Sequence, residues 1–363
     1  MKPFEHIKTA IRRKGADALL VTQPENRRYL SGYKATDLAI TESSGVLLIP
    51  GQGDPYLITD SRYQLQAERE AGGFGIVLVR GSMLIALEKL LKRLDTRKLI
   101  FESHYLLHAT FRKLAEIGQK HAIELIPAEG MVEKLRIIKS PEEIEKIRQA
   151  VRLNEAVFQE VLVNVVPGKT EREIALAIET AMMLKGAEEP AFPTIVAAGP
   201  NGALPHAVPS DRAIQEGETV IIDMGLKLDG YCADMTRTLI LGSPDRQTLE
   251  IMRLVRKAQE AALKTIRGGI LARDADRAAR KEIAAAGYGK YFGHGLGHGV
   301  GLAVHEAPSL NRTRRNKLKP GMVVTVEPGI YLPGWGGVRL ENMVVVEEKG
   351  CLVLNQDITF LDV

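Results

Sequence analysis

The feature that most constrains the fold of this chain is the stretch 217–238, which predicts a β-hairpin with two aspartates. Residues 219–223 are mostly apolar and β-branched, as in a short buried strand. The dipeptide at 229–230, Asp-Gly, is typical of a two-residue hairpin turn. Residues 231–241 predict the return strand, so the two aspartates lie on opposite arms.

The register of this hairpin decides how the two aspartates meet. With a turn at 229–230, Asp223 faces Thr236 and Asp234 is its diagonal neighbour; with a turn at 228–229, the two aspartates face each other. Both registers place the carboxylates on one face, where like charges repel unless a cation lies between them. A solvated polar face is the alternative, which the apolar flanking residues disfavour.

The chain repeats this pattern, which indicates an internal duplication. In each copy one acidic residue stands six positions after a glycine, and a second stands four positions after another glycine. Two such hairpins, related by a pseudo-two-fold axis, would aim four carboxylates at one point, and two divalent cations would balance their charge. The four acids are Asp223, Asp234, Glu327 and Glu341.

Composition bounds the class of protein. A length of 363 residues predicts two or three domains, and 45% hydrophobic with 26% charged residues is ordinary for a globular protein. The net charge of +4 comes from interspersed basic and acidic residues, and we interpret the basic cluster 312–319 as a solvated loop. No nucleic-acid partner is therefore expected.

Cysteine use and hydropathy indicate a cytoplasmic location. The two cysteines, Cys232 and Cys351, provide no disulfide framework, and Cys232 is expected to pack as a small buried hydrophobe. The N-terminus has charges throughout and lacks the apolar core of a signal peptide. Because no segment approaches the ~20 apolar residues of a membrane span, we expect a soluble protein with no membrane partner.

Residues 1–132 predict an α/β domain. Strand-like segments at 18–21, 46–49, 55–58 and 98–101 alternate with helical segments, which predicts a mostly parallel sheet covered on both faces. This part of the chain has no glycine-rich phosphate loop and no cluster of His, Cys or acidic residues. We therefore interpret it as architectural.

Residues 133–363 predict an α+β domain that contains the duplication. Capping boxes at 140–143 and 170–173 begin two helices of the first copy. The second copy begins with helical segments at 247–265 and 272–286.

Between the two acidic hairpins, glycine occupies every second position from 293 to 301. This density excludes a helix, and the spacing matches neither a dinucleotide-binding nor a P-loop fingerprint. The alternation lets the backbone approach a neighbour closely while His294 and His298 point the other way. His305-Glu306 lacks the second histidine of a zincin helix, but three histidines within twelve residues favour a functional site.

These motifs together resemble those of the pita-bread metallopeptidases: methionine aminopeptidase, aminopeptidase P, prolidase and the metal-free relative creatinase. The resemblance covers nearly the whole chain, and its first motif is similar to the signature of a creatinase-type N-terminal domain. That domain favours the proline-directed branch over methionine aminopeptidase. The motifs run from Asn26 to Tyr33, Gly230 to Thr238, His294 to Glu306, Glu327 to Tyr331 and Gly337 to Glu341.

Position by position, the resemblance implies a metal-binding set and a substrate-binding set. Asp234 and Glu341 would each bridge two ions. Arg339 either meets the carboxylate of a short substrate or orients a metal ligand on the same strand face. The implied metal ligands are Asp223, Asp234, His298, Glu327 and Glu341. The implied substrate-site residues are His206, His294, His305 and Arg339. Because an Xaa-Pro substrate needs an apolar recess for the proline ring, His294 and Tyr331 are also expected at the substrate site, as walls of that recess.

The resemblance implies a creatinase-type domain at 1–132 and a pita-bread domain with a pseudo-two-fold duplication at 133–363. The expected reaction is hydrolysis of Xaa-Pro bonds at the N-terminus of short peptides by a hydroxide that bridges two divalent ions. Glu327 would move the proton, and His305 and His206 would donate to the oxyanion. An oxygen-rich ligand set with one imidazole favours Mn²⁺, with Co²⁺ or Zn²⁺ as alternatives.

An Xaa-Pro dipeptidase is the favoured activity, and an aminopeptidase P that cleaves longer Xaa-Pro-Xaa peptides is the close alternative. Two other classes are a catalytically inactive peptide-binding protein of this fold and a metal-free amidinohydrolase similar to creatinase. Both are disfavoured because all five ligand positions carry ligating residues. By resemblance, a homodimer is expected.

Overall fold

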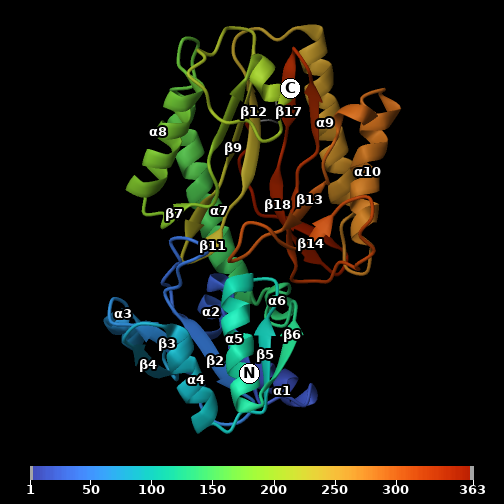
Figure 1. The fold of residues 1–363 in the computed structure, drawn as a ribbon. Coiled ribbons are helices and arrows are strands. Elements are labelled where there is room, and N and C mark those ends of the chain that lie inside the picture. The colour runs from blue at the N-terminus through green and yellow to red at the C-terminus, as the bar shows by residue number, and fades with distance from the viewer. Residues whose placement is uncertain (1–2, 360–363) are drawn as a thin grey trace. The chain divides into compact units, whose positions relative to one another are not determined.

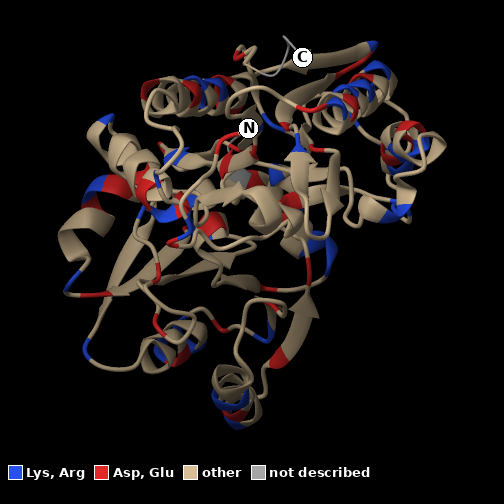
Figure 2. Cartoon of the chain, turned by 90° about the horizontal axis from the view of Figure 1, so that it is seen from above, with Lys and Arg blue, Asp and Glu red and all other residues tan. Residues whose placement is uncertain are grey.

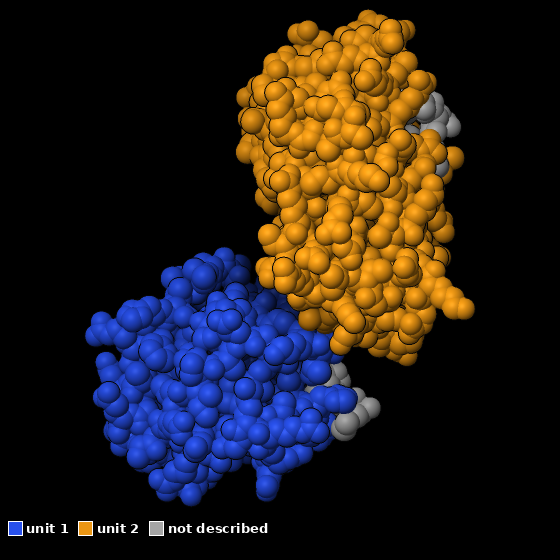
Figure 3. Space-filling model, turned by 90° about the vertical axis from the view of Figure 1, so that its right-hand side faces the viewer, with its two compact units in different colours: residues 1–136 blue, residues 137–363 orange. Residues whose placement is uncertain are grey.

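The computed structural model describes residues 3–359 of the chain (Figure 1). Two compact units make up the protein, Met1–Arg136 and Ile137–Val363 (Figure 3). Across the described residues, no helix combines the length and the apolar character that crossing a membrane requires.

The first unit is built on a six-stranded sheet with the strand order β4-β3-β2-β1-β5-β6. Three of its five pairings are parallel, and both antiparallel pairings are made by β2. Alternate residues of β1 enter two separate apolar cores, one shared with α1, α2 and α3 and the other with α4 and α5, so helices cover both faces. The strands are β1 (Ala18–Val21), β2 (Val46–Pro50), β3 (Tyr56–Asp60), β4 (Gly75–Val79), β5 (Lys98–Glu102) and β6 (Glu124–Ala128). The helices are α1 (Pro3–Arg13), α2 (Pro24–Ser31), α3 (Gln64–Glu70), α4 (Met83–Arg93) and α5 (His108–His121).

The short helix α6 (Glu133–Arg136) ends the first unit, so the division lies four residues after the boundary expected at 132. Arg136 Nη1 donates to Asn26 Oδ1 at 2.8 Å, and Asn26 Nδ2 donates to Glu133 Oε1 at 2.8 Å. Asn26 is the first residue of the motif that resembles a creatinase-type domain, and its carboxamide holds α6 against this unit.

The second unit contains the predicted duplication. In each copy a central strand pairs antiparallel with one strand that precedes it and one that follows it: β9 with β8 and β12, and β15 with β13 and β18. A helix pair accompanies each copy, α7 with α8 and α9 with α10, and the two pairs flank the strands on opposite sides (Figure 1). The first copy comprises α7 (Pro141–Leu162), α8 (Glu171–Leu184), β7 (Glu189–Pro190), β8 (Ile195–Ala198), η1 (Gly199–Ala203), β9 (Thr219–Met224), β10 (Leu226–Leu228), β11 (Tyr231–Cys232) and β12 (Met235–Ile240). The second comprises α9 (Arg246–Thr265), α10 (Ala272–Ala285), η2 (Gly289–Tyr291), β13 (Gly297–Gly299), β14 (Glu306–Leu310), β15 (Val323–Val326), β16 (Gly329–Leu332), β17 (Gly336–Arg339), β18 (Asn342–Glu347) and β19 (Gly350–Val353).

Both helices of the first copy begin at the predicted capping boxes. Ser140 Oγ accepts from the Glu143 backbone N–H at 3.3 Å, and the Glu143 carboxylate accepts in return from the Ser140 N–H at 2.9 Å. Thr170 and Glu173 make the same reciprocal pair at the start of α8. Each box satisfies two backbone donors that a helix start leaves without intrahelical partners.

Candidate metal centre

The first acidic hairpin has the diagonal register. Asp223 pairs opposite Thr236, and the turn residues Asp229 (φ 46°) and Gly230 (φ 84°) both have positive φ, as a two-residue turn of type I′ requires. Asp234 is therefore the diagonal neighbour of Asp223. Of the two registers that the sequence allowed, the structure adopts the one with the turn at 229–230.

The second acidic hairpin differs by one residue in its turn. Val326 pairs with Asn342, and Gly329 pairs with Arg339, so that Glu327 and Glu341 stand directly opposite each other. A three-residue loop, 333–335, replaces the two-residue turn of the first copy. The two halves of the site are thus similar in position but not identical in pairing.

The glycine-rich run forms β13 and lies between β14 and β15. A Cβ atom at Gly297 would overlap the Thr325 carbonyl oxygen, and one at Gly299 would overlap the Ala307 carbonyl oxygen. The alternating glycines therefore let this strand approach both neighbours. Glu327 is held at the same edge because its N–H donates to the Leu296 carbonyl at 2.8 Å.

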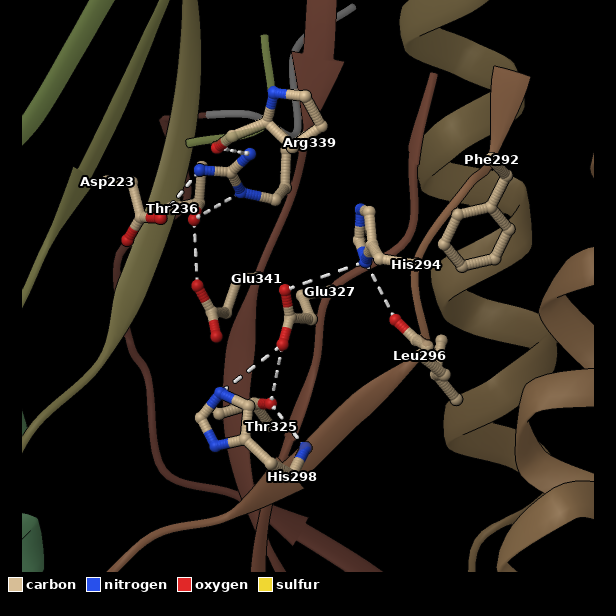
Figure 4. A network of polar contacts seen from close by, with 12 residues as sticks. Asp223, Thr236, Phe292, His294, Leu296, His298, Thr325, Glu327, Arg339 and Glu341 are labelled. Atoms are coloured by element: carbon tan, nitrogen blue, oxygen red, sulfur yellow. Dashed lines mark hydrogen bonds and ion pairs between the residues drawn. The ribbon is translucent and has the colours of Figure 1, made fainter. Parts of the chain in front are cut away.

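His298 presents one ring nitrogen to the acidic residues (Figure 4). Its Nδ1 lies 3.2 Å from the Gly299 carbonyl oxygen, which can only accept, so Nδ1 carries the proton and Nε2 keeps its lone pair. Nε2 lies 3.6 Å from Asp234 Oδ2 and 3.4 Å from Glu327 Oε1. Ligand atoms of Asp234, His298 and Glu341 all lie within 4.8 Å of one another.

Two threonines to which the sequence analysis assigned no role orient the carboxylates. Thr236 Oγ1 donates to Glu341 Oε2 at 2.7 Å, and Thr325 Oγ1 donates to Glu327 Oε1 at 3.1 Å. Each lies two residues from an acidic ligand position on the same strand arm, Thr236 after Asp234 and Thr325 before Glu327. Period-two spacing from a predicted ligand is the signal that would have found them.

Arg339 is buried and bonded to protein groups. Its Nη2 lies 2.5 Å from Asp223 Oδ2, and its Nη1 donates to Tyr331 Oη at 2.9 Å. The Tyr331 hydroxyl lies 2.9 Å from His294 Nε2, and His294 Nδ1 lies 2.8 Å from the Gly295 carbonyl oxygen. Because that carbonyl can only accept, His294 Nδ1 donates to it, and Nε2 accepts from Tyr331. Of the two roles that the sequence left open for Arg339, these contacts match the orientation of Asp223.

The carboxylates are buried and crowded, which opposes their ionisation. Burial and the neighbouring acids raise the pKa of Asp234 and of Glu341 well above their usual range. Burial, reinforced by Asp223 and opposed by Arg339, raises the pKa of Glu327 to about 8. Burial also lowers the pKa of His298 to about 4, which keeps its ring neutral, as a metal ligand must be.

These residues fit divalent cations. Asp223 Oδ1 is buried and has no hydrogen-bond partner among residues 3–359, which is costly for a carboxylate oxygen unless a cation is bound there. Four carboxylates and one neutral imidazole are ligands suited to hard or borderline divalent ions, and positive charge between them would remove the repulsion that raises their pKa values.

The four acidic residues line a cavity of about 540 Å³. His206 and His305 are exposed at this cavity, and His294 lines it as well. Tyr331 does not line it, contrary to the expectation that it forms a recess wall, because its hydroxyl is turned to His294 and Arg339. The apolar wall is instead supplied by Phe192, Pro193 and Ile195, which the sequence analysis did not single out.

The free energy of unfolding of the metal-free protein is expected to fall as the pH rises from 6.5 to 8. The lower limit is the ordinary pKa of histidine, and the upper limit is the pKa of Glu327 in the folded protein. A carboxyl whose folded pKa is raised from 4.5 to about 8 stays protonated after the unfolded chain has released its proton. Its contribution to stability is therefore complete at low pH and lost as the pH rises through about 8. Above pH 6.5 the histidines of the unfolded chain are mostly neutral, so the opposing contribution of His294 and His298, whose folded pKa is lowered to about 4, fades across this interval.

Urea unfolding in the presence of a chelator, at several pH values across this interval, measures the effect. Glu327→Gln should flatten the slope because it removes one raised carboxyl. Metal-loaded protein should show the opposite trend, since metal competes with protons for these ligands. A free energy of unfolding that rises with pH in the metal-free protein would contradict the prediction.

Both parts of the chain match known protein families. Residues 145–348 match the description "Metallopeptidase family M24", and residues 4–138 match "Creatinase/Prolidase N-terminal domain". The Xaa-Pro dipeptidase of Pyrococcus furiosus is 34% identical over 92% of this chain and 92% of that protein.

Two solved structures extend this comparison. The Xaa-Pro dipeptidase from Bacillus anthracis has a TM-score of 0.92 and 38% identity over 98% of both chains. The X-Pro aminopeptidase from Thermotoga maritima has a TM-score of 0.90 and 36% identity over 98% of this chain and 97% of that one. The family resemblance and the fold class predicted from the motifs are confirmed: a creatinase-type domain followed by a duplicated pita-bread domain.

Proposed function

Because this chain belongs to metallopeptidase family M24 and carries a creatinase/prolidase N-terminal domain, we propose that it is an Xaa-Pro dipeptidase. The observation that carries the proposal is the convergence of four carboxylates and the free Nε2 of His298 at one end of a cavity lined by further histidines. The similarity to Xaa-Pro dipeptidases over nearly the whole chain supports the choice of substrate class.

The metal ligands in this proposal are Asp223, Asp234, His298, Glu327 and Glu341, and the favoured ions are two Mn²⁺, with Co²⁺ or Zn²⁺ as alternatives. When bound, such ions activate water at neutral pH and polarise the carbonyl of the scissile bond. We further propose a cytoplasmic homodimer, on the composition and on the resemblance to the family.

The residues of this chain then position and move protons. Glu327 accepts from Thr325 through Oε1, so its orientation is fixed, and we assign it the transfer of the water proton to the leaving nitrogen. His305 and His206, exposed on the open side of the cavity, are assigned as donors to the developing oxyanion. His294 uses both ring nitrogens within the protein and therefore serves as a wall.

Replacing Arg339 with alanine is expected to lower metal affinity and activity about 10–100-fold, the usual cost of losing a group that orients a ligand. The loss should be the same for Xaa-Pro and Xaa-Pro-Xaa substrates, because Arg339 acts through Asp223. Tyr331→Phe, which removes one partner of Arg339 and keeps the charge, should have a smaller effect. A defect confined to the KM of dipeptides, with metal affinity intact, would instead assign Arg339 to the substrate carboxylate.

Substrate preference tests the proposed activity directly. An Xaa-Pro bond has no amide hydrogen to donate, so the site needs an apolar recess at the leaving residue, which Phe192, Pro193 and Ile195 can provide. We expect kcat/KM to be highest for Xaa-Pro, lower for Xaa-Pro-Xaa and lowest for Xaa-Ala. Equal or faster cleavage of the tripeptide would identify an aminopeptidase P, the second candidate, which the similarity to the Thermotoga maritima enzyme supports.

Preference for Xaa-Ala would defeat both peptidase assignments. Hydrolysis of none of the three peptides by metal-loaded protein would favour the inactive peptide-binding alternative. Full activity without metal would favour a creatinase-like reaction. The intact set of five ligand residues argues against these last two alternatives.

A further inference from the structure

A basic groove lies on the second unit outside the metal centre. Helix α10 and the loop 311–319 form it, and the loop is held to the start of the helix by Ala272 N–H to Asn316 O (2.9 Å) and Arg273 N–H to Arg314 O (3.0 Å). The groove has a volume of about 280 Å³, close to the lower end of small-molecule sites, which is about 300 Å³. Five of its seven lining residues are basic and one is acidic (basic residues are blue and acidic residues red in Figure 2).

The helix carries these cations at an electrostatic cost. Arg273, Arg277 and Lys281 follow one another at intervals of four, which places three like charges on one helix face. Arg273 also stands in the first turn of α10, where the helix dipole disfavours cations. A row of cations that goes against both of these helix preferences is typical of a functional site.

The one acid in the groove is already neutralised. Both oxygens of Asp276 bind Arg280, at 2.7 Å and 2.9 Å. Arg280 also donates to the carbonyls of Phe292 and His294, each at 2.7 Å, so its donors are used within the protein. The Asp276–Arg280 pair therefore forms a fixed wall of the groove. The other four basic lining residues are not neutralised by Asp276.

Three of the remaining cations have hydrogen-bond donors that are not fully used within the protein. In the described part of the chain, Arg273 Nε is buried without a hydrogen-bond partner, and Asp274 Oδ1 lies 4.0 Å away from it. Within residues 3–359, the exposed Arg312 side chain makes no hydrogen bond or ion pair. Arg277 is 3.4 Å from Asp274 at the rim, with a side chain that is 69% exposed. Guanidinium groups with free donors are suited to bidentate binding of phosphate.

We propose that this groove binds a small molecule carrying two or more phosphoryl groups. A phosphoryl group has a charge of about −1.5 to −2 and three acceptor oxygens, so two of them would balance the net positive charge of the lining residues. The convergence of α10 with a loop about 40 residues further along the chain confines the cations to a pocket, which fits a compact ligand better than an extended nucleic-acid backbone.

The test uses fructose 1,6-bisphosphate as a probe, titrated calorimetrically into metal-loaded full-length protein at constant ionic strength. Fructose, without phosphoryl groups, should not bind, and fructose 6-phosphate should bind more weakly than the bisphosphate. The double variant Arg277→Glu/Arg312→Glu should raise the Kd for the bisphosphate at least tenfold. Arg246→Glu/Arg253→Glu makes the same charge change at exposed positions of α9 and should leave the Kd unchanged.

Two further measurements test whether the bisphosphate binds at the metal ligands instead and whether the groove variant is folded. Asp234→Ala protein should bind the bisphosphate as the wild type does, because the groove is separate from the metal ligands. Hydrolysis of Xaa-Pro by the groove variant should stay at the wild-type rate, which shows that it is folded. Unchanged binding in the groove variant, loss of binding in Asp234→Ala, or tighter binding of a short single-stranded DNA than of the bisphosphate would each overturn the proposal.

Discussion

Replacing Asp234 or Glu341 with alanine is expected to abolish metal binding and peptidase activity together. Both carboxylates are buried, and Asp234 shares a set of ligand atoms within 4.8 Å with His298 and Glu341. In the proposed site each of these carboxylates would serve both ions, so its loss would remove the charge stabilisation that the pair of ions supplies. That stabilisation is several kcal/mol, which corresponds to a rate loss of about 10³-fold or more.

Metal content by mass spectrometry, measured beside kcat/KM, checks this expectation. In the wild type a chelator should remove activity, and Mn²⁺ or Co²⁺ should restore it. Glu155→Ala is a matched control: it removes another buried carboxylate, which accepts from the N–H groups of Gln356 and Asp357, and should keep the metal. Full activity of metal-free protein would rule out the proposed mechanism.

Replacing His305 with alanine is expected to lower kcat by ~10²–10³, the usual cost of removing one donor to an oxyanion, and to leave metal content unchanged. His305 is exposed at the cavity, and its ring packs edge-on against His298 with centroids 4.3 Å apart. It therefore lies beside a proposed ligand without completing the ligand set.

The control for this variant is His108→Ala, which removes an exposed histidine of the first unit and should change neither rate nor metal content. His305→Gln retains a hydrogen-bond donor and should recover part of the rate. If His305→Ala instead loses metal in proportion to its activity, the ring supports His298 and does not act on the substrate.

The duplicated architecture and the proposed ligand positions both follow from spacing along the sequence. One acid follows a glycine by six residues and a second follows another glycine by four, and the repeat of both spacings at 223 and 234 and again at 327 and 341 predicts two similar hairpins. Capping boxes at Ser140 and Thr170 likewise predicted where two helices begin, because a cap depends on residues only three positions apart.

The tertiary structure decided what depends on contacts between distant parts of the chain. Arg339 meets Asp223 across a separation of 116 residues, and only the packing of the two copies brings them together. Arg339 also donates to the hydroxyl of Tyr331, which does not line the cavity, and the apolar wall is supplied by Phe192 and its neighbours. Local spacing fixes which residues share a strand face, but the partner across the interface is set by how the two hairpins pack, which no local pattern encodes.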